Sequence, residues 1–293
     1  MSESEGTAEA EQLRLGNEVA LVGEGKGGGP AIVLCHGLTA TRRQVVHGSR
    51  VLPRGGFRMV SYDARGHGDS DPAPEGSGYG YPQLSEDLDA VLDETSPEAP
   101  ALLAGHSMGA HTIVAYALQK PERVAGLVVI GPVNAGAVDR ETMDEALERW
   151  DALADGLERG GVDGFVEEVD RGGIDPDWRE TVLRFTRERM LAHRHPEAVV
   201  RALREVPRSL PFESLDELDF LDLPALVVAS HDVADPHHPY AVAEAYAQHL
   251  PRAKLVSEEE GESPLAWQGG RLSREIATFA EQDAVRERLG PSS

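Results

Sequence analysis

Short runs of apolar, mostly β-branched residues recur along the chain, and most of them end in Gly, Ser, Asp or His. They are Ala31–Cys35, Phe57–Tyr62, Ala101–Ala104, Leu127–Ile130, Ala225–Ala229 and Ala253–Val256. Each run is too short for a core helix, so the pattern predicts buried parallel strands. Helical patterns lie between them, for example at Leu84–Leu92 and Ala110–Gln119. This alternation predicts an α/β fold, with a mainly parallel sheet and helices on both faces.

The alternation stops after Pro132, where the sequence becomes charged and amphipathic with a helical period. The helices expected there are Glu141–Arg159, Val162–Asp170, Pro176–Arg194 and Pro196–Arg208. No strand pattern returns before Leu223, so we expect an inserted helical lid. The predicted organisation is an unstructured acidic tail over residues 1–12, a core over residues 13–133 and 221–293, and the lid over residues 134–220.

Composition narrows the range of partners. The chain has 293 residues, with 28 Lys and Arg against 51 Asp and Glu, which gives a formal net charge of −23. Such a chain repels phosphate backbones, so we expect no nucleic-acid partner. Its apolar runs are shorter than the roughly 20 residues of a membrane helix. Residues 1–12 lack the features of a signal peptide, and Cys35 is the only cysteine, so we expect a cytoplasmic protein without membrane contacts.

A G-x-S-x-G pattern follows the strand expected at Ala101–Ala104 and precedes a helix. It reads Gly105-His106-Ser107-Met108-Gly109. This context predicts a sharp turn that exposes the Ser107 hydroxyl as a nucleophile, with the Met108 amide at the helix start. A second amide, that of Leu38 in His36-Gly37-Leu38, follows the Ala31 strand. We predict that Leu38 and Met108 together form an oxyanion hole.

A third segment, after the Phe57 strand, reads Asp63-Ala64-Arg65-Gly66-His67-Gly68-Asp69-Ser70. With these three segments the chain resembles the α/β-hydrolase superfamily, in particular its lidded esterase-like and haloperoxidase-like members, over about residues 13–280. The resemblance implies the α/β-hydrolase fold with Ser107 as nucleophile, and it implies no cofactor. It does not specify the substrate.

The family's order is Ser, then acid, then His. Asp232 stands where the acid is expected, in the turn after the Ala225 strand, and Asp235 is the alternative. The base should follow the last strand, where relatives commonly read Gly-His-x-Pro. Here the segment from Glu260 to Pro264 has Glu262 at the position of the histidine, and the last histidine of the chain is His249.

Three interpretations of this departure stay open. Glu262 could be the base, if burial beside Asp232 raised one of their pKa values. A substitute histidine could act instead; the candidates are His231, His237 and His238. In the third interpretation Ser107 is not an efficient nucleophile, and the pocket binds a ligand or catalyses a reaction without an acyl-enzyme. The alternative to all three is that Glu262 points to solvent and marks a decayed site.

The sequence therefore predicts an enzyme that hydrolyses a small ester, lactone or thioester through Ser107 with an atypical base. Two alternatives belong to other classes: a pseudo-hydrolase that binds a small molecule, and a non-hydrolytic biosynthetic enzyme such as a cyclase. Each needs only a small-molecule partner. The adjacent His237 and His238 have no Cys or further His at metal-binding spacing, and Asp235 beside them is weak evidence for a ligand set, so we expect no metal site.

Overall fold

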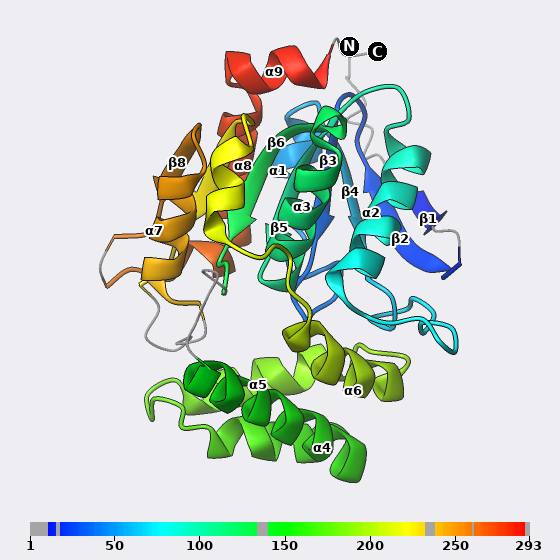
Figure 1. The fold of residues 1–293 in the computed structure, drawn as a ribbon, viewed down its shortest axis with the longest axis vertical. Coiled ribbons are helices and arrows are strands. Elements are labelled where there is room, and N and C mark those ends of the chain that lie inside the picture. Colours follow the sequence, from blue (N-terminus) through cyan, green and yellow to red (C-terminus); the bar gives the residue numbers. More distant parts are fainter. Residues whose placement is uncertain (1–10, 16–17, 134–139, 232–237, 260, 291–293) are drawn as a thin grey trace, which may run out of the picture.

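A computed structural model describes the chain except for residues 1–10, 16–17, 134–139, 232–237, 260 and 291–293 (Figure 1). The described strands form one sheet in the order β1-β2-β4-β3-β5-β6-β7-β8. Their bounds are β1 Glu11–Leu15, β2 Leu21–Lys26, β3 Ala31–Cys35, β4 Arg58–Tyr62, β5 Ala101–His106, β6 Val124–Ile130, β7 Ala225–Val228 and β8 Ala253–Val256. Strands β3 to β8 pair in parallel, whereas β1 and β2 are antiparallel. The predicted mainly parallel sheet is confirmed.

Helices cover both faces of this sheet. Their bounds are α1 Val51–Arg54, α2 Tyr81–Thr95, α3 Met108–Gln119, α4 Arg140–Arg171, α5 Arg179–Met190, α6 Pro196–Glu205, α7 Tyr240–His249, α8 Gly269–Ala280 and α9 Asp283–Leu289, with short 3-10 turns η1 Pro121–Arg123, η2 Val206–Arg208, η3 Leu215–Phe220 and η4 Leu265–Trp267. Residue Val33 of β3 packs in the core shared with α2, α3 and α7, and its neighbours Ile32 and Leu34 pack in the core shared with α1, α8 and α9. Strands buried on both sides read as continuous apolar runs, which is why the sequence revealed them. Among the described helices, none has the length and apolar composition that crossing a bilayer requires.

The two antiparallel strands were not expected from the sequence. Strand β1 begins at Glu11, inside the predicted tail, which corrects the boundary at residue 12. The inward positions of β2 include two glycines, so its apolar alternation is hidden. A Cβ atom at Gly23 would lie 2.9 Å from the Leu15 side chain and 3.0 Å from the Ser61 carbonyl oxygen. Close strand packing therefore favours glycine where the pattern would need an apolar residue.

Helices α4, α5 and α6 form a separate layer at one end of the sheet, and we call them the helical cap (Figure 1). Their buried side chains share one core with Leu38, Ala64 and Met108, which follow β3, β4 and β5. The cap therefore lies against the carboxyl ends of the parallel strands. The predicted break between its first two helices is present inside α4, because Gly161 has a φ of 59°. That the cap acts as a lid stays a prediction.

Candidate active site

Ser107 occupies a tight turn between β5 and α3. Its φ is 52° and its ψ −113°, and the only other residue besides glycine with positive φ in the described chain is His47. The Ser107 N–H donates to the Ile130 carbonyl oxygen at 3.0 Å, and its own carbonyl accepts from the His111 N–H at 3.1 Å. The residue is half-buried, so its hydroxyl is not sealed inside the core. A residue in such a strained backbone conformation costs about 1–3 kcal/mol of stability, and the conformation persists only where surrounding contacts enforce it.

The glycines on either side of Ser107 are required by close packing. A Cβ atom at Gly105 would lie 2.2 Å from the Gly109 carbonyl oxygen, and one at Gly109 would lie 2.1 Å from the Cys35 carbonyl oxygen. Cβ atoms in proteins essentially never lie within 3.0 Å of such an atom, so a larger residue at either position would force the backbone to move. The turn and its flanking strand and helix thus match the predicted elbow at Gly105–Gly109.

The loop after β3 lies directly against this turn. A Cβ atom at Gly37 would be 3.4 Å from the Ser107 Cβ atom. The His36 Nε2 atom accepts the Ala64 N–H at 2.9 Å, so its Nδ1 atom carries the proton and donates to the Gly37 carbonyl oxygen at 2.8 Å. The Ala40 N–H donates to the same oxygen at 2.9 Å. Because the Leu38 N–H shares that peptide plane and points the opposite way, these bonds fix its direction.

The two predicted oxyanion residues belong to one hydrophobic core. Leu38 and Met108 are both buried in the core that the cap helices complete. Met108 begins α3, and the first N–H groups of a helix have no partner within the helix. A nitrogen of the His67 ring lies 2.7 Å from the Leu38 carbonyl oxygen, which holds the next peptide of the loop as well. That the Leu38 and Met108 amides form an oxyanion hole stays a prediction.

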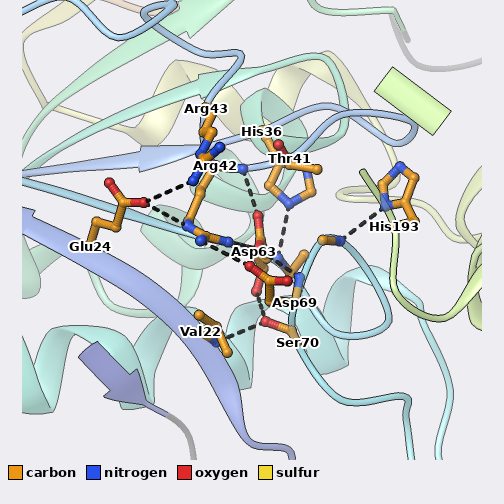
Figure 2. A network of polar contacts seen from close by, with 12 residues as sticks. Val22, Glu24, His36, Thr41, Arg42, Arg43, Asp63, Asp69, Ser70 and His193 are labelled. Atoms are coloured by element: carbon orange, nitrogen blue, oxygen red, sulfur yellow. Dashed lines mark hydrogen bonds and ion pairs between the residues drawn. The ribbon is translucent and has the colours of Figure 1, made fainter. Parts of the chain in front are cut away.

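A buried ion pair joins the loop after β3 to the loop after β4 (Figure 2). Asp63 is fully buried and accepts the backbone N–H groups of Arg42 at 2.7 Å and Asp69 at 3.0 Å. The Arg42 guanidinium also contacts the Asp63 carboxylate, and it reaches Asp69 at 3.0 Å and Glu24 at 3.3 Å. A Cβ atom at Gly68 would collide with the Asp63 carboxylate, so this glycine is required too. The sequence analysis placed Asp63 in a motif but did not foresee Arg42 as its partner.

His193 joins the cap to these loops. Its Nδ1 atom accepts the Gly68 N–H at 3.0 Å, so its Nε2 atom donates to the Thr39 carbonyl oxygen, 3.2 Å away. The neighbouring Arg194 N–H donates to the Gly68 carbonyl oxygen at 2.8 Å. Burial, with a smaller effect of His67, lowers the pKa of His193 from 6.5 to about 3. The imidazole is therefore neutral in the folded protein.

This neutral imidazole makes stability depend on pH. Between pH 6.5 and about 3 the unfolded chain protonates His193 while the folded chain does not, so stability is lost as the pH falls through this range. One such group contributes a slope of about 1.4 kcal/mol per pH unit. We expect His193→Gln, whose amide can accept and donate but does not titrate, to flatten the curve of unfolding free energy against pH by about that amount. Urea unfolding at several pH values between 4.5 and 7.5 measures it; parallel curves for the two proteins would contradict the assignment.

The candidate bases differ in their surroundings. Glu262 is exposed, and its carboxylate accepts from Arg271 at 2.6 Å, which lowers the pKa of Glu262. The shared-proton hypothesis requires a raised pKa, so this pairing argues against it. His231 is exposed and stacks on Tyr240 with ring centroids 4.2 Å apart. Glu262 as a base stays a prediction that its surroundings do not favour.

His238 packs against a residue of the elbow. Its ring centroid is 4.9 Å from that of His106, the residue directly before Ser107. Its Cδ2 atom would be 3.2 Å from a Cβ atom at Gly131, the residue that follows Ile130. Three further residues of the proposed site, namely Asp232, the alternative acid Asp235, and His237, lie outside the described residues.

One group of potential metal ligands occurs among the described residues. Asp216, Asp219 and His249 have ligand atoms within 4.8 Å of one another, and both carboxylates are exposed. Exposed acidic groups of this kind are common in proteins without a bound ion. His249 already contacts Asp219 at 2.9 Å, which explains the arrangement as a surface pair.

Comparisons with known proteins agree with this geometry. Residues 30–268 match the family model of the alpha/beta hydrolase fold. The sequence is 39% identical over 102 residues to the sn-1-specific diacylglycerol lipase ABHD11 of Mus musculus, a match that spans 34% of this chain and 32% of that protein. The structure resembles an esterase from Thermogutta terrifontis (TM-score 0.75, 23% identity, 97% of this chain and 100% of that one) and the enol-lactonase from Burkholderia xenovorans (TM-score 0.70, 22% identity, 93% and 100%). At these identities the two structures establish the fold alone.

Proposed function

Because the chain belongs to the α/β-hydrolase family, we propose that it hydrolyses a small ester, lactone or thioester with Ser107 as the nucleophile. The observation that carries the proposal is the backbone of Ser107, held at a φ of 52° between a strand and a helix with its side chain half-buried. This conformation presents a hydroxyl at the carboxyl end of the sheet, where a bound carbonyl carbon can be attacked.

The negative charge that develops on the substrate oxygen would be held by the amides of Leu38 and Met108. The Met108 amide lies at the start of α3, where the helix dipole favours an anion. The direction of the Leu38 amide is supported by the bonds of His36 and Ala40 to the Gly37 carbonyl oxygen. Such donors act best when they are held in place before the reaction begins, and the bonds to the Gly37 carbonyl oxygen hold the Leu38 amide in this way.

We assign the proton transfer to His238, with Asp232 as the acid. A neutral imidazole accepts a hydroxyl proton at neutral pH far more readily than the Glu262 carboxylate, whose pKa Arg271 lowers below its ordinary value. The His238 ring also packs against the ring of His106, which directly precedes the nucleophile in the sequence. The His231 side chain, by contrast, is exposed and stacks on Tyr240. Asp232 follows His231 directly in the sequence and is assigned from the family's order alone.

The cap would serve as a lid over this site. Its core includes Leu38 and Met108, so the cap helices pack on the residues proposed to hold the oxyanion. A layer that packs on residues next to the nucleophile would shield the reaction from water. An esterase and an enol-lactonase are among the solved structures that share this fold.

Single substitutions of the three candidate bases test the proposal. We expect His238→Ala to lower the turnover of p-nitrophenyl acetate by about 10²–10⁴, the usual contribution of a general base. His231→Ala is the matched control, since it removes an exposed imidazole that directly precedes Asp232. Glu262→Gln should leave turnover nearly unchanged. A large loss in Glu262→Gln with none in His238→Ala would instead identify Glu262 as the base.

A further inference from the structure

Glu258 is a buried carboxylate just beyond the end of β8. Its side chain is 3% exposed, although acidic side chains are rarely buried without a cationic partner. Three hydrogen bonds surround it: from the Ser230 hydroxyl at 2.9 Å, from the His231 N–H at 2.6 Å, and from the Leu265 N–H at 2.9 Å. Burial alone would raise the pKa of Glu258, but these bonds outweigh it and lower the pKa. The group therefore stays a carboxylate in the folded protein.

The three donors belong to two different loops. Ser230 and His231 follow β7 and directly precede Asp232 in the sequence. Leu265 begins the η4 turn, and the ring of Trp267 in that turn lies 5.4 Å from the ring of His106. The Oε1 atom accepts from the first loop and the Oε2 atom from the second. One rigid carboxylate thus sets the distance between the loop after β7 and the turn that packs beside the elbow.

We infer that Glu258 is a positioning residue for the reaction at Ser107, because it fixes the His231 peptide, which directly precedes the proposed acid Asp232 in the sequence, against the turn that packs on His106. This inference rests on the proposed function. Glu258 touches neither the nucleophile nor the substrate in this scheme; it acts through the backbone of the loop after β7. A shift of about 1 Å in a reacting group is enough to cost a large part of its rate.

The role requires a carboxylate and not merely a side chain of this size. A carboxylate accepts at both oxygens, whereas an amide accepts at one and donates at the other. In Glu258→Gln, the amide NH₂ would therefore face either the Leu265 N–H or the His231 N–H, and one bond would be lost. Glu259→Gln is the matched control: the neighbouring side chain is exposed, and the charge change is the same.

The test compares steady-state hydrolysis of p-nitrophenyl acetate by the full chain and its variants, at a temperature where circular dichroism shows all of them folded. We expect Glu258→Gln to lower kcat at least tenfold with KM within a factor of two, and Glu259→Gln to match the wild type. A merely structural role would lower the melting temperature and leave kcat of the folded protein unchanged, and that result would overturn the inference.

Two further comparisons keep the outcome decisive. If Glu258→Gln does not fold, Ser230→Ala, which removes one of the three bonds, is expected to lower kcat about threefold; an unchanged kcat in that variant overturns the inference. Failure of the proposed function is recognised separately, because the wild type and Ser107→Ala would then hydrolyse the ester at the same rate. An inference that fails alone leaves that difference intact and shows equal kcat for the wild type and Glu258→Gln.

Discussion

Ser107→Ala is expected to lower ester hydrolysis by about 10⁴ or more, because the amides of the oxyanion site can give only residual catalysis without a nucleophile. The substitution removes a single oxygen atom and leaves the turn's backbone bonds to Ile130 and His111 available. Turnover of p-nitrophenyl acetate under identical conditions measures the loss. An alanine variant with near-normal turnover would remove Ser107 from the mechanism.

Ser85→Ala is the matched control for this substitution. Ser85 is buried in α2, and its hydroxyl has no hydrogen-bond partner among the described residues. Its removal should therefore leave both turnover and folding nearly unchanged. A comparable loss of turnover in the two variants would point to a general effect on the fold.

Arg65→Met is expected to have the largest effect on stability, a loss of about 3–5 kcal/mol, because it leaves a carboxylate buried without its cation. Arg65 and Asp87 are both almost inaccessible and form two parallel bonds of 2.7 and 2.8 Å. Arg65 also donates to the carbonyl oxygens of Gly78 at 2.9 Å and Gln83 at 3.3 Å, so it fastens the loop after β4 to the start of α2. Urea unfolding at pH 7.5 measures the change.

Two companion variants identify the cause of that loss. The double variant Arg65→Met/Asp87→Leu should recover part of it, since neither charge then remains buried alone. Arg159→Met removes an arginine that is 69% exposed and pairs with Glu168, and it should cost less than about 1 kcal/mol. Equal losses of unfolding free energy in Arg65→Met and Arg159→Met would show that the buried ion pair stabilises the fold no more than an exposed one.

The sequence predicted the parts of the fold whose causes are local. Strand β3 has the predicted bounds because its apolar run is contiguous in the chain, and β8 has them although Lys254 interrupts its short run. The elbow was predictable because Gly105, Ser107 and Gly109 lie within five positions and their spacing follows from close backbone contacts. Strand β2 was missed because the packing that requires Gly23 removes the apolar pattern.

The parts of the site that the sequence did not reveal depend on partners far apart in the chain. His193 and Gly68 are separated by 125 positions, and no local pattern connects them. Glu258 and His231 are 27 positions apart, and nothing in the acidic run distinguishes the buried Glu258 from the exposed Glu259 beside it. The replacement of the expected histidine by Glu262 was visible in the sequence. Its pairing with Arg271 was not, and that pairing shifts the proposal toward His238.

The reaction of the folded protein with a fluorophosphonate, followed by mass spectrometry of the intact chain and of its peptides, tests the nucleophile most directly. An activated serine displaces the fluoride and keeps the phosphonyl group, so one adduct per chain on the peptide that contains Ser107 is the expected result. A chain that stays unmodified while it remains folded, or an adduct on a different residue, would contradict the account.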